Sequence, residues 1–308
     1  MTRRVLTVGT RGSALALAQS AAVAAVLAES ACAVSDLVRI KTEGDVNAGP
    51  LASIGGTGIF VTALRSALLE GRVDVIVHSY KDLPTAPADG LTIGAVPARE
   101  DPADALCARD GLTLDQLPAG ARVGTGSPRR AAQLLRRRPD LTVEPIRGNV
   151  DTRLRLVSDG GLDAVVLAVS GLARLGRTAA ITQRFGPDVM VPAPAQGALA
   201  VECRSADVET AWFAGALRAF DSSPTRAAVT AERSLLATLE AGCIAPVGAQ
   251  ALVRDGALIL DAVVLAVDGS DEIRARTTGP VARADELGRE LAKGMLSSGA
   301  ASLLGAVR

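Results

Sequence analysis

The sequence predicts an α/β protein made of two lobes with parallel-rich sheets, followed by a small C-terminal α+β domain. Apolar strand-like runs alternate with helical runs through the first two hundred residues, a pattern typical of parallel sheets covered by helices. The pattern resets near Glu100-Asp-Pro102, and from Ser222 it changes to alternating apolar positions that favour an antiparallel hairpin. A chain of 308 residues is also long for one compact domain.

The first lobe is predicted to consist of residues 1–98 and 198–218. A helix is expected at Ser13–Glu29 with Ser13 as its N-cap, and a second helix at Ile59–Glu70. Strands are expected at Val5–Thr10, Val34–Thr42, Val73–His78, Leu91–Val96 and Ala198–Cys203. Because Val73–His78 is apolar on both faces, it is expected to be a central parallel strand, and ligands are expected at the carboxyl ends of such strands.

The second lobe is predicted at residues 99–197 and the third domain at 219–308. Strands of the second lobe are expected at Ala105–Ala108, Arg122–Gly126, Thr142–Ile146 and Ala164–Ala168. Val191–Gly197 is interpreted as the return crossing, and two short crossings predict two lobes with a cleft between them. The third domain is expected to contain a helix at Pro224–Glu240, a hairpin of Val247–Val253 and Leu258–Val267 turning at Asp255-Gly256, and a closing helix at Leu287–Leu304.

Composition excludes several classes of function. The net charge is zero and aromatic residues make up only 2%, so the chain lacks the basic surface and stacking rings of nucleic-acid binders. No stretch approaches the roughly 20 uninterrupted apolar residues of a membrane span. The four cysteines are far apart, which argues against a metal site or a disulfide framework and favours a reducing cytoplasm. Gly9-Thr-Arg-Gly-Ser13 interrupts the only stretch that resembles a secretion signal.

Arginines are concentrated between Arg122 and Arg155, a stretch that contains nine arginines and only three acidic residues. Within this stretch, Val123-Gly-Thr-Gly-Ser127 predicts a strand, a tight turn and a helix N-terminus, an arrangement that suits an anion. Arg129 and Arg130 lie in the first helical turn, against the helix dipole. We therefore expect something negative to bind beside them, whereas Arg136–Arg138 at the helix end are expected to face water.

Polar residues also follow the strand Val73–His78. His78 itself is interpreted as a satisfied core histidine. Ser79, Lys81 and Asp82 are expected to converge at the strand end, where Asp82 is either an ordinary surface partner of Lys81 or a carboxylate that stabilises a cation or transfers a proton. Arg11 and Ser13 follow the first strand in the same way, whereas the Gly55–Gly58 loop is interpreted as a plain turn.

The cysteines fall into two groups. Cys32, Cys107 and Cys203 lie in apolar runs and are expected to be buried and inert. Cys243 follows a long helix in a loop flanked by glycine and proline, which favours the exposure that a nucleophile or an attachment point requires.

Taken together, these segments resemble the porphobilinogen deaminase (hydroxymethylbilane synthase) family. The resemblance runs from Val8 to about Gly248 and is specific through the order and spacing of its motifs. The motifs are Gly9-Thr-Arg-Gly-Ser13, Val77-His-Ser-Tyr-Lys-Asp-Leu-Pro84, Val123-Gly-Thr-Gly-Ser-Pro-Arg-Arg130, Arg147-Gly-Asn-Val-Asp-Thr-Arg153 and Leu239-Glu-Ala-Gly-Cys243.

The resemblance implies two lobes like those of periplasmic binding proteins and a third domain that presents Cys243. It implies a cytoplasmic, monomeric transferase of tetrapyrrole biosynthesis, with a dipyrromethane cofactor joined to Cys243 through a thioether. Porphobilinogen would lose ammonia to give an electrophilic azafulvene, which the terminal pyrrole attacks. Four head-to-tail additions followed by hydrolysis would release hydroxymethylbilane.

The resemblance also implies roles for individual residues, with no metal, nucleic-acid or membrane partner. Asp82 matches the catalytic carboxylate. The cofactor would be bound by Cys243, Ser79, Lys81, Asp82, Thr125, Ser127, Arg129, Arg130, Arg147 and Gly148. The acetate and propionate groups of the substrate would be bound by Arg11, Ser13, Gln19, Arg153, Arg174 and Gln196.

Four positions depart from the family pattern. Thr57 stands where lysine is common, Gly126 where serine or threonine is common, Pro128 where leucine is common, and Tyr80 where a smaller or aliphatic residue is usual. These departures bear on cofactor loading or rate.

Two rival interpretations are a solute-binding protein and the effector half of a transcription regulator. Removal of a signal would delete Arg11 and Ser13, a regulator needs a DNA-reading helix-turn-helix, and neither explains a cysteine in a third domain.

Overall fold

A computed structural model describes residues 3–41, 58–241 and 245–305 of the chain. The chain divides into two compact units. The N-terminal unit comprises Met1–Arg99 and Ala198–Arg226, and the C-terminal unit comprises Glu100–Gly197 and Ala227–Arg308. Helix α9 (Ser223–Thr238) begins in the first unit and continues in the second. The division into three domains at the boundaries given above stays a prediction.

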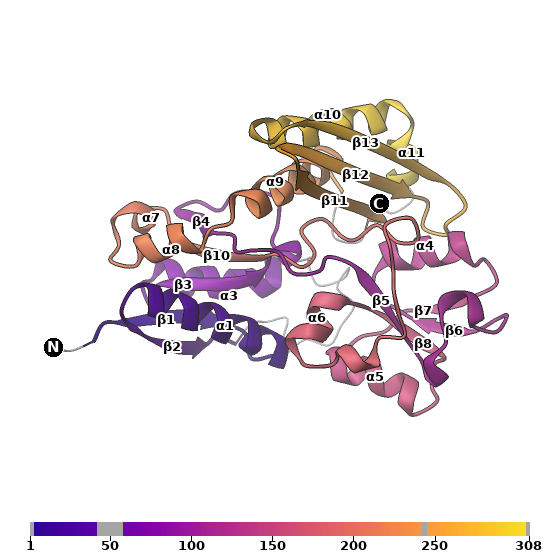
Figure 1. Cartoon of the computed structure of the whole chain (residues 1–308), viewed down its shortest axis with the longest axis horizontal. Helices are drawn as coiled ribbons and strands as arrows, with labels where there is room; N and C mark the ends of the chain where they lie inside the picture. Colours follow the sequence, from indigo (N-terminus) through magenta and orange to yellow (C-terminus); the bar gives the residue numbers. More distant parts are fainter. Residues whose placement is uncertain (1–2, 42–57, 242–244, 306–308) are drawn as a thin grey trace. The chain divides into compact units, whose positions relative to one another are not determined.

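The N-terminal unit contains a five-stranded sheet of order β2-β1-β3-β10-β4 (Figure 1). The strands are β1 (Val5–Thr10), β2 (Val34–Arg39), β3 (Val75–Ser79), β4 (Leu91–Ala95) and β10 (Leu199–Arg204). β1 pairs in parallel with β2 and β3, whereas β10 pairs antiparallel with β3 and β4. Four strands therefore share one direction and β10 opposes them, so the sheet is parallel-rich rather than wholly parallel. β3 is central, as the sequence predicts.

Helices pack on both faces of this sheet, which explains why β3 is apolar on both sides. Val75 and Val77 pack with α1 (Ala14–Ser30) and α8 (Ala214–Phe220). Ile76, whose side chain points to the opposite face, packs with Leu64 and Leu68 of α3 (Gly58–Leu69). The short elements η2 (Tyr80–Asp82) and α7 (Asp207–Thr210) complete the unit.

The C-terminal unit contains a second five-stranded sheet, of order β7-β6-β8-β5-β9. Its strands are β5 (Asp104–Ala108), β6 (Arg122–Gly124), β7 (Thr142–Glu144), β8 (Ala164–Ala168) and β9 (Gln183–Arg184). β6 is parallel to β7 and β8, while β5 is antiparallel to β8 and β9. The sequence did not indicate β9, which is only two residues long. Helices and turns between the strands are α4 (Pro128–Arg137), α5 (Val150–Ser158), α6 (Val169–Arg174), η3 (Arg109–Gly111), η4 (Leu114–Gln116) and η5 (Thr178–Ala180).

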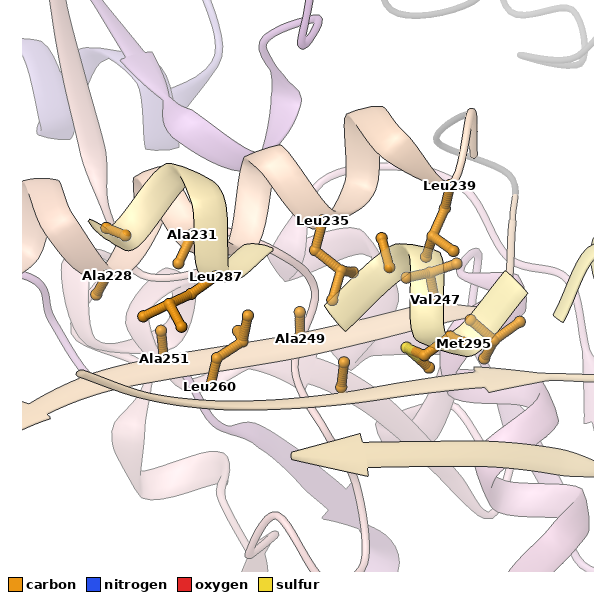
Figure 2. Close-up of a cluster of buried hydrophobic side chains, with 14 of the residues drawn as sticks. Ala228, Ala231, Leu235, Leu239, Val247, Ala249, Ala251, Leu260, Leu287 and Met295 are labelled. Atoms are coloured by element: carbon orange, nitrogen blue, oxygen red, sulfur yellow. The ribbon is translucent and has the colours of Figure 1, made fainter. Parts of the chain in front are cut away.

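The rest of the C-terminal unit is an antiparallel sheet of β11 (Val247–Arg254), β12 (Ala257–Leu265) and β13 (Glu272–Pro280). Helices α9, α10 (Ala284–Ser297) and α11 (Ala300–Gly305) pack against it, with η6 (Val281–Arg283) leading into α10. Figure 2 shows Leu235 of α9, and Leu239 just after the end of that helix, near Val247. The three belong to one buried apolar cluster. The predicted hairpin is confirmed: Arg254 pairs with Ala257, and positive φ at Asp255 and Gly256 closes the turn.

One strand of this region was missed and one predicted helix is wrong. The strand β13 was not predicted, because its sequence EIRARTTGP alternates polar residues with few apolar ones, as an edge strand permits. The single closing helix Leu287–Leu304 is two helices, α10 and α11, separated at Gly299 with φ of 101°. No helix in the described part of the chain is both long and apolar enough to span a bilayer.

Candidate active site

Parallel pairing brings the first group of predicted site residues to one edge of the N-terminal sheet. β1 ends at Thr10 and its parallel neighbour β3 ends at Ser79, so their carboxyl ends meet at the same edge. Gln19 of α1 and Ser79 are joined there by amide–hydroxyl hydrogen bonds of 3.1 and 3.2 Å. Ser13 caps α1 by accepting a hydrogen bond from the Ala16 N–H, which confirms the predicted N-cap.

Asp82 and Lys81 lie in η2, the turn that follows β3 directly. The Asp82 side chain is exposed and Lys81 is half-buried. The turn is anchored on either side of them: the Tyr80 N–H donates to the Ala198 carbonyl at 3.0 Å, and Leu83 is buried against Val61. Tyr80 packs against the same cluster, so this departure from the family pattern adds apolar contact beneath the turn. An exposed carboxylate on an anchored turn can meet a ligand.

His78 is confirmed as a core residue. It is 7% exposed, and its Nε2 lies 3.2 Å from Oε2 of Glu202 on β10. Arg65 donates to the same carboxylate from Nε and Nη2. Burial raises the pKa of Glu202, but hydrogen bonds from His78 and Arg65 outweigh it, so the net pKa is lowered.

The second group of site residues begins at the turn after β6. Thr125 is buried, its N–H donates to the Glu144 carbonyl, and its hydroxyl accepts from the Ser127 N–H at 3.2 Å. Ser127 is the N-cap of α4, but its side chain makes no capping hydrogen bond. Pro128 occupies the first turn, where its fixed φ suits a helix start. The Ser127 hydroxyl is therefore not used to cap the helix.

Arg129 and Arg130 are buried, 3% and 6% exposed, and both bind Asp104. Arg129 Nη1 lies 2.7 Å from Oδ2, and Arg130 Nη2 lies 2.7 Å from Oδ1. Burial raises the pKa of Asp104, yet the charges of the two arginines outweigh it and hold that pKa far below its usual value. The anion expected beside this helix start is thus supplied in part by the protein itself.

Arg153 lies beside the turn that follows β6, where its Nη2 would be 3.8 Å from a Cβ added at Gly126. Arg147 follows Ile146, whose N–H donates to the Thr125 carbonyl. The Nε of Arg153 donates to the Gly148 carbonyl at 2.9 Å. Burial lowers the pKa of Arg153, and the charge of Arg130 lowers it further. Arg147 is exposed, and Gly148 has φ of 101°, a conformation that favours glycine. Arg129 and Arg130 bind one buried carboxylate, Asp104, and Arg153 adds a third positive charge beside Arg130, so the net charge of this group is positive.

Arg174 and Gln196 make contacts inside the C-terminal unit. Arg174 Nε pairs with Glu100 at 2.9 Å, and its Nη2 donates to the Gly197 carbonyl at 2.8 Å. Gln196 is 1% exposed, and its Nε2 donates to Asp104 Oδ1 at 2.8 Å and to the Pro102 carbonyl at 2.7 Å. The structure therefore groups Gln196 with Arg129 and Arg130, and Arg174 with the two crossing segments.

Two residues singled out from the sequence, Cys243 and Thr57, lie outside the described residues.

The structure contradicts two expectations, for Cys32 and for Arg138. Cys32 is exposed, because it lies just past the end of α1 with φ of 51°, whereas Cys107 and Cys203 are buried as expected. Arg138 does not simply face water: it pairs with Asp140 and donates to the Leu114 and Leu117 carbonyls.

Sequence reasoning missed Asp104 itself. The available signal was a single acidic residue in the otherwise apolar run Ala103–Ala108. A charge buried among apolar residues requires a partner, and the arginine-rich stretch was the obvious source. Glu202, which is 2% exposed in the run Ala198–Cys203, shows the same pattern. The described residues contain no cluster of histidine, cysteine and carboxylate side chains suited to a metal.

Comparison with known proteins identifies the family. Residues 6–211 match the model "Porphobilinogen deaminase, dipyromethane cofactor binding domain", and residues 226–297 match "Porphobilinogen deaminase, C-terminal domain". The porphobilinogen deaminase of Thermobifida fusca is 54% identical over 303 residues, which cover 95% of this chain and 93% of that protein. That of Mycobacterium tuberculosis is 52% identical over 313 residues, covering 99% and 100%.

Among solved structures, a periplasmic substrate-binding protein from Coxiella burnetii aligns with a TM-score of 0.45 and 14% identity, covering 70% of this chain and 92% of that one. The sequence matches span both units and nearly the full length of the relatives. This chain belongs to the porphobilinogen deaminase family.

Proposed function

We propose that this protein is a porphobilinogen deaminase. It deaminates four porphobilinogen molecules and joins them head to tail on a dipyrromethane primer held by Cys243, then releases hydroxymethylbilane. Membership of the family over both of its domains carries the proposal. The net positive group at the start of α4 supports it, because each pyrrole ring of the substrate carries an acetate and a propionate.

The residues of the C-terminal unit fit a polycarboxylate cofactor. Arg129 is 3% exposed, and its Nε–H has no hydrogen-bond partner among the described residues. A buried guanidinium donor left without a partner is costly unless a ligand accepts from it. Arg129, Arg130 and Arg147, with Thr125, Ser127 and Gly148, would hold the cofactor. When bound, that cofactor supplies the free pyrrole α-carbon to which each new unit is added.

Residues of the N-terminal unit are assigned to the substrate and to the reaction. Arg11, with Ser13 and Gln19, binds ring carboxylates, as do Arg153 and Arg174 of the other unit. Ser79 and Lys81 bind the cofactor beside Asp82. Bidentate guanidinium–carboxylate pairing gives both affinity and orientation.

Asp82 is assigned the catalytic role. Loss of ammonia from the aminomethyl group leaves a cationic, electron-poor pyrrole, and the attacking ring carbon must afterwards lose a proton. A carboxylate stabilises the first species and accepts or relays the proton in the second step. Asp82 suits both tasks because it is exposed on a turn fixed by Tyr80 and Leu83.

Intact-mass measurement tests the covalent cofactor. The purified protein is expected to weigh more than its sequence mass by one dipyrrole unit, and Cys243→Ala is expected to lack that increment. Cys32→Ala is the matched control, because Cys32 is exposed and should leave the increment in place. Active wild-type protein with the bare sequence mass would contradict the proposal.

Ammonia release tests Asp82. Asp82→Ala is expected to fold normally and to lose almost all ammonia release from porphobilinogen. Asp89→Ala changes another exposed carboxylate of the same unit and is expected to leave the rate unchanged. A solute-binding protein would bind porphobilinogen without releasing ammonia from it, so the wild-type assay separates this rival from the enzyme.

We also propose that the protein acts as a cytoplasmic monomer without nucleic-acid or membrane partners. Four scattered cysteines and a zero net charge support this setting. Cell fractionation and light scattering of the purified protein test it; a stable dimer or a membrane-bound fraction would contradict it.

A further inference from the structure

The position of Asp104 follows from one reversed strand. β5 is antiparallel to β8, and Asp104, its first residue, pairs with Ala168, the last residue of β8. β8 and β6 are parallel, so the carboxyl edge of this sheet also carries Thr125 and the start of α4. The reversal therefore places a carboxylate at the edge where the site residues lie.

Asp104 binds three predicted site residues at once. Its Oδ1 accepts from Arg130 Nε at 2.9 Å and from Gln196 Nε2 at 2.8 Å, while Oδ2 lies 2.7 Å from Arg129 Nη1. Both guanidinium groups are also fixed by carbonyls: Arg129 Nη1 donates to Val191 and Arg130 Nη1 to Val166. These contacts set the orientation of the two planar guanidinium groups. The direction of their other N–H groups is therefore fixed as well.

The residue before Gln196, Ala195, is in turn held by a buried carboxylate from α9. Glu232 is fully buried; its Oε2 accepts from the Ala195 N–H at 2.5 Å, and its Oε1 accepts from the Ala251 N–H at 2.6 Å. Ala195, the residue before Gln196, has φ of 61°, a strained conformation for alanine that its neighbours must maintain. Glu232 therefore ties the return segment, and Gln196 with it, to α9 and β11.

These contacts form a continuous buried path within the C-terminal unit. It runs from Glu232 through the Ala195–Gln196 peptide to Asp104, and from there to Arg129 and Arg130. α9 ends at Thr238, five positions before Cys243 in the sequence. The helix that leads to the predicted attachment point is thereby connected to the predicted cofactor-binding arginines.

We propose that Asp104 is a positioning residue for the reaction, and that Glu232 and Gln196 align it with the segment that leads to Cys243. This inference rests on the proposed function. Asp104 does not touch the substrate; it orients Arg129 and Arg130 so that their remaining N–H groups, including the buried Nε of Arg129, meet the carboxylates of the tethered chain. Gln196 accordingly acts through Asp104 rather than by direct contact with substrate.

Asp104→Asn is the first test, because it keeps the shape of the side chain and removes its charge. We expect folded protein with incomplete cofactor loading by intact mass, and a KM for porphobilinogen raised about ten- to hundredfold, the worth of one charge-assisted hydrogen bond. The kcat of the loaded fraction is expected to change less than KM. Glu202→Gln is the matched control, since it neutralises an equally buried carboxylate in the other unit and is expected to retain full cofactor loading.

Gln196→Leu is the second test and keeps the inference open to refutation if Asp104→Asn does not fold. It retains the Asp104 charge and removes one hydrogen bond to it, so we expect a smaller rise in KM in the same direction. Full loading and wild-type KM in the folded variants would overturn the positioning role. Wild-type protein without the dipyrrole increment and without ammonia release would instead overturn the proposed function.

Discussion

The two five-stranded sheets share one plan but use a buried carboxylate differently. Each has four strands in one direction and one reversed strand, β10 in the N-terminal unit and β5 in the C-terminal unit. Each reversed strand carries one buried acid, Glu202 and Asp104. Glu202 pairs with Ile76, the second residue of β3, whereas Asp104 pairs with the last residue of β8.

Position along the strand thus separates a structural carboxylate from one that can serve a site. Glu202, whose backbone pairs near the amino end of β3, binds a core histidine and an arginine of α3. Asp104, at the carboxyl edge, binds arginines beside the turn that follows β6. Both sheets therefore pair a buried carboxylate with arginine, but only in the C-terminal unit do these arginines lie at the carboxyl edge of the sheet.

The largest expected effect on stability is that of Asp104→Leu. It would leave two buried guanidinium groups without their carboxylate, and breaking a buried ion pair in this way costs about 3–5 kcal/mol. Urea unfolding of the C-terminal unit measures the loss. A change below about 1 kcal/mol would show that the arginines find other acceptors and would remove the basis of the comparison.

Glu202→Leu is expected to cost less, about 1–3 kcal/mol. Arg65 has a 20% exposed side chain that water can solvate once the carboxylate is removed. The same urea titration, applied to the N-terminal unit, checks this. If Glu202→Leu lowers the free energy of unfolding more than Asp104→Leu does, the exposure of the arginine partners does not determine the cost.

The turns that follow β1 and β6 are expected to respond differently to an added methyl group. At Gly126 a Cβ would lie 2.7 Å from the Ile146 carbonyl oxygen, whereas at Gly12 it would meet nothing within 4 Å. We expect Gly126→Ala to cost about 1–3 kcal/mol and Gly12→Ala to stay within about 0.5 kcal/mol. Thermal unfolding of the two variants provides the measurement, and equal shifts would contradict the difference.

Acid sharpens the comparison further. The pKa of Asp104 is lowered in the folded state, so its stabilisation is fully present above its unfolded pKa of about 3.9 and is lost as pH falls through the lower folded value. The stability difference between wild type and Asp104→Asn should therefore be constant from pH 7 to about pH 5 and shrink below about pH 4. A difference that grows on acidification would reverse the assigned sign.

The smallest effect concerns the thiols of the two reversed strands. Burial raises the pKa of both Cys107 and Cys203 to about 11, so a thiolate-seeking reagent at pH 8 should leave both untouched and label Cys32, which is exposed. Peptide mapping after labelling checks this. Modification of Cys107 or Cys203 in folded protein would show that its strand opens.

The positions of many helices and strands could be predicted from the sequence, because hydrophobic periodicity is a local property of the chain. β1 and β8 begin and end at the predicted residues, since each is a compact apolar run between turn residues. β13 was not predicted, because an edge strand need not bury both faces and so lacks a clear apolar pattern. The direction of β5 and β10 depends on pairing between distant segments, which periodicity does not record.

For the candidate site, the sequence could predict which strand ends lie together but not which side chains pair. Parallel strand ends predict that Ser79 and the α1 residues meet, and the Gln19–Ser79 contact agrees with this. The burial of Arg129 and Arg130 was not predictable from their charge, because it depends on Asp104, which is 25 positions away from Arg129 in the chain. An isolated acid in an apolar strand is the local sign of such a distant partner.

The discontinuous N-terminal unit has a consequence for the order of folding. Its sheet requires β10, which lies between β3 and β4 yet is synthesised after residue 198. The five strands of the second sheet, by contrast, lie within residues 104–184. On the ribosome the later sheet is therefore the first that can be completed, and the position between β3 and β4 stays unfilled until β10 has been synthesised. The Glu100 N–H donates to the Gly197 carbonyl at 3.3 Å, so folding of the intervening segment also delivers β10 close to the point where the chain left the first sheet, which shortens the loop that remains to be closed.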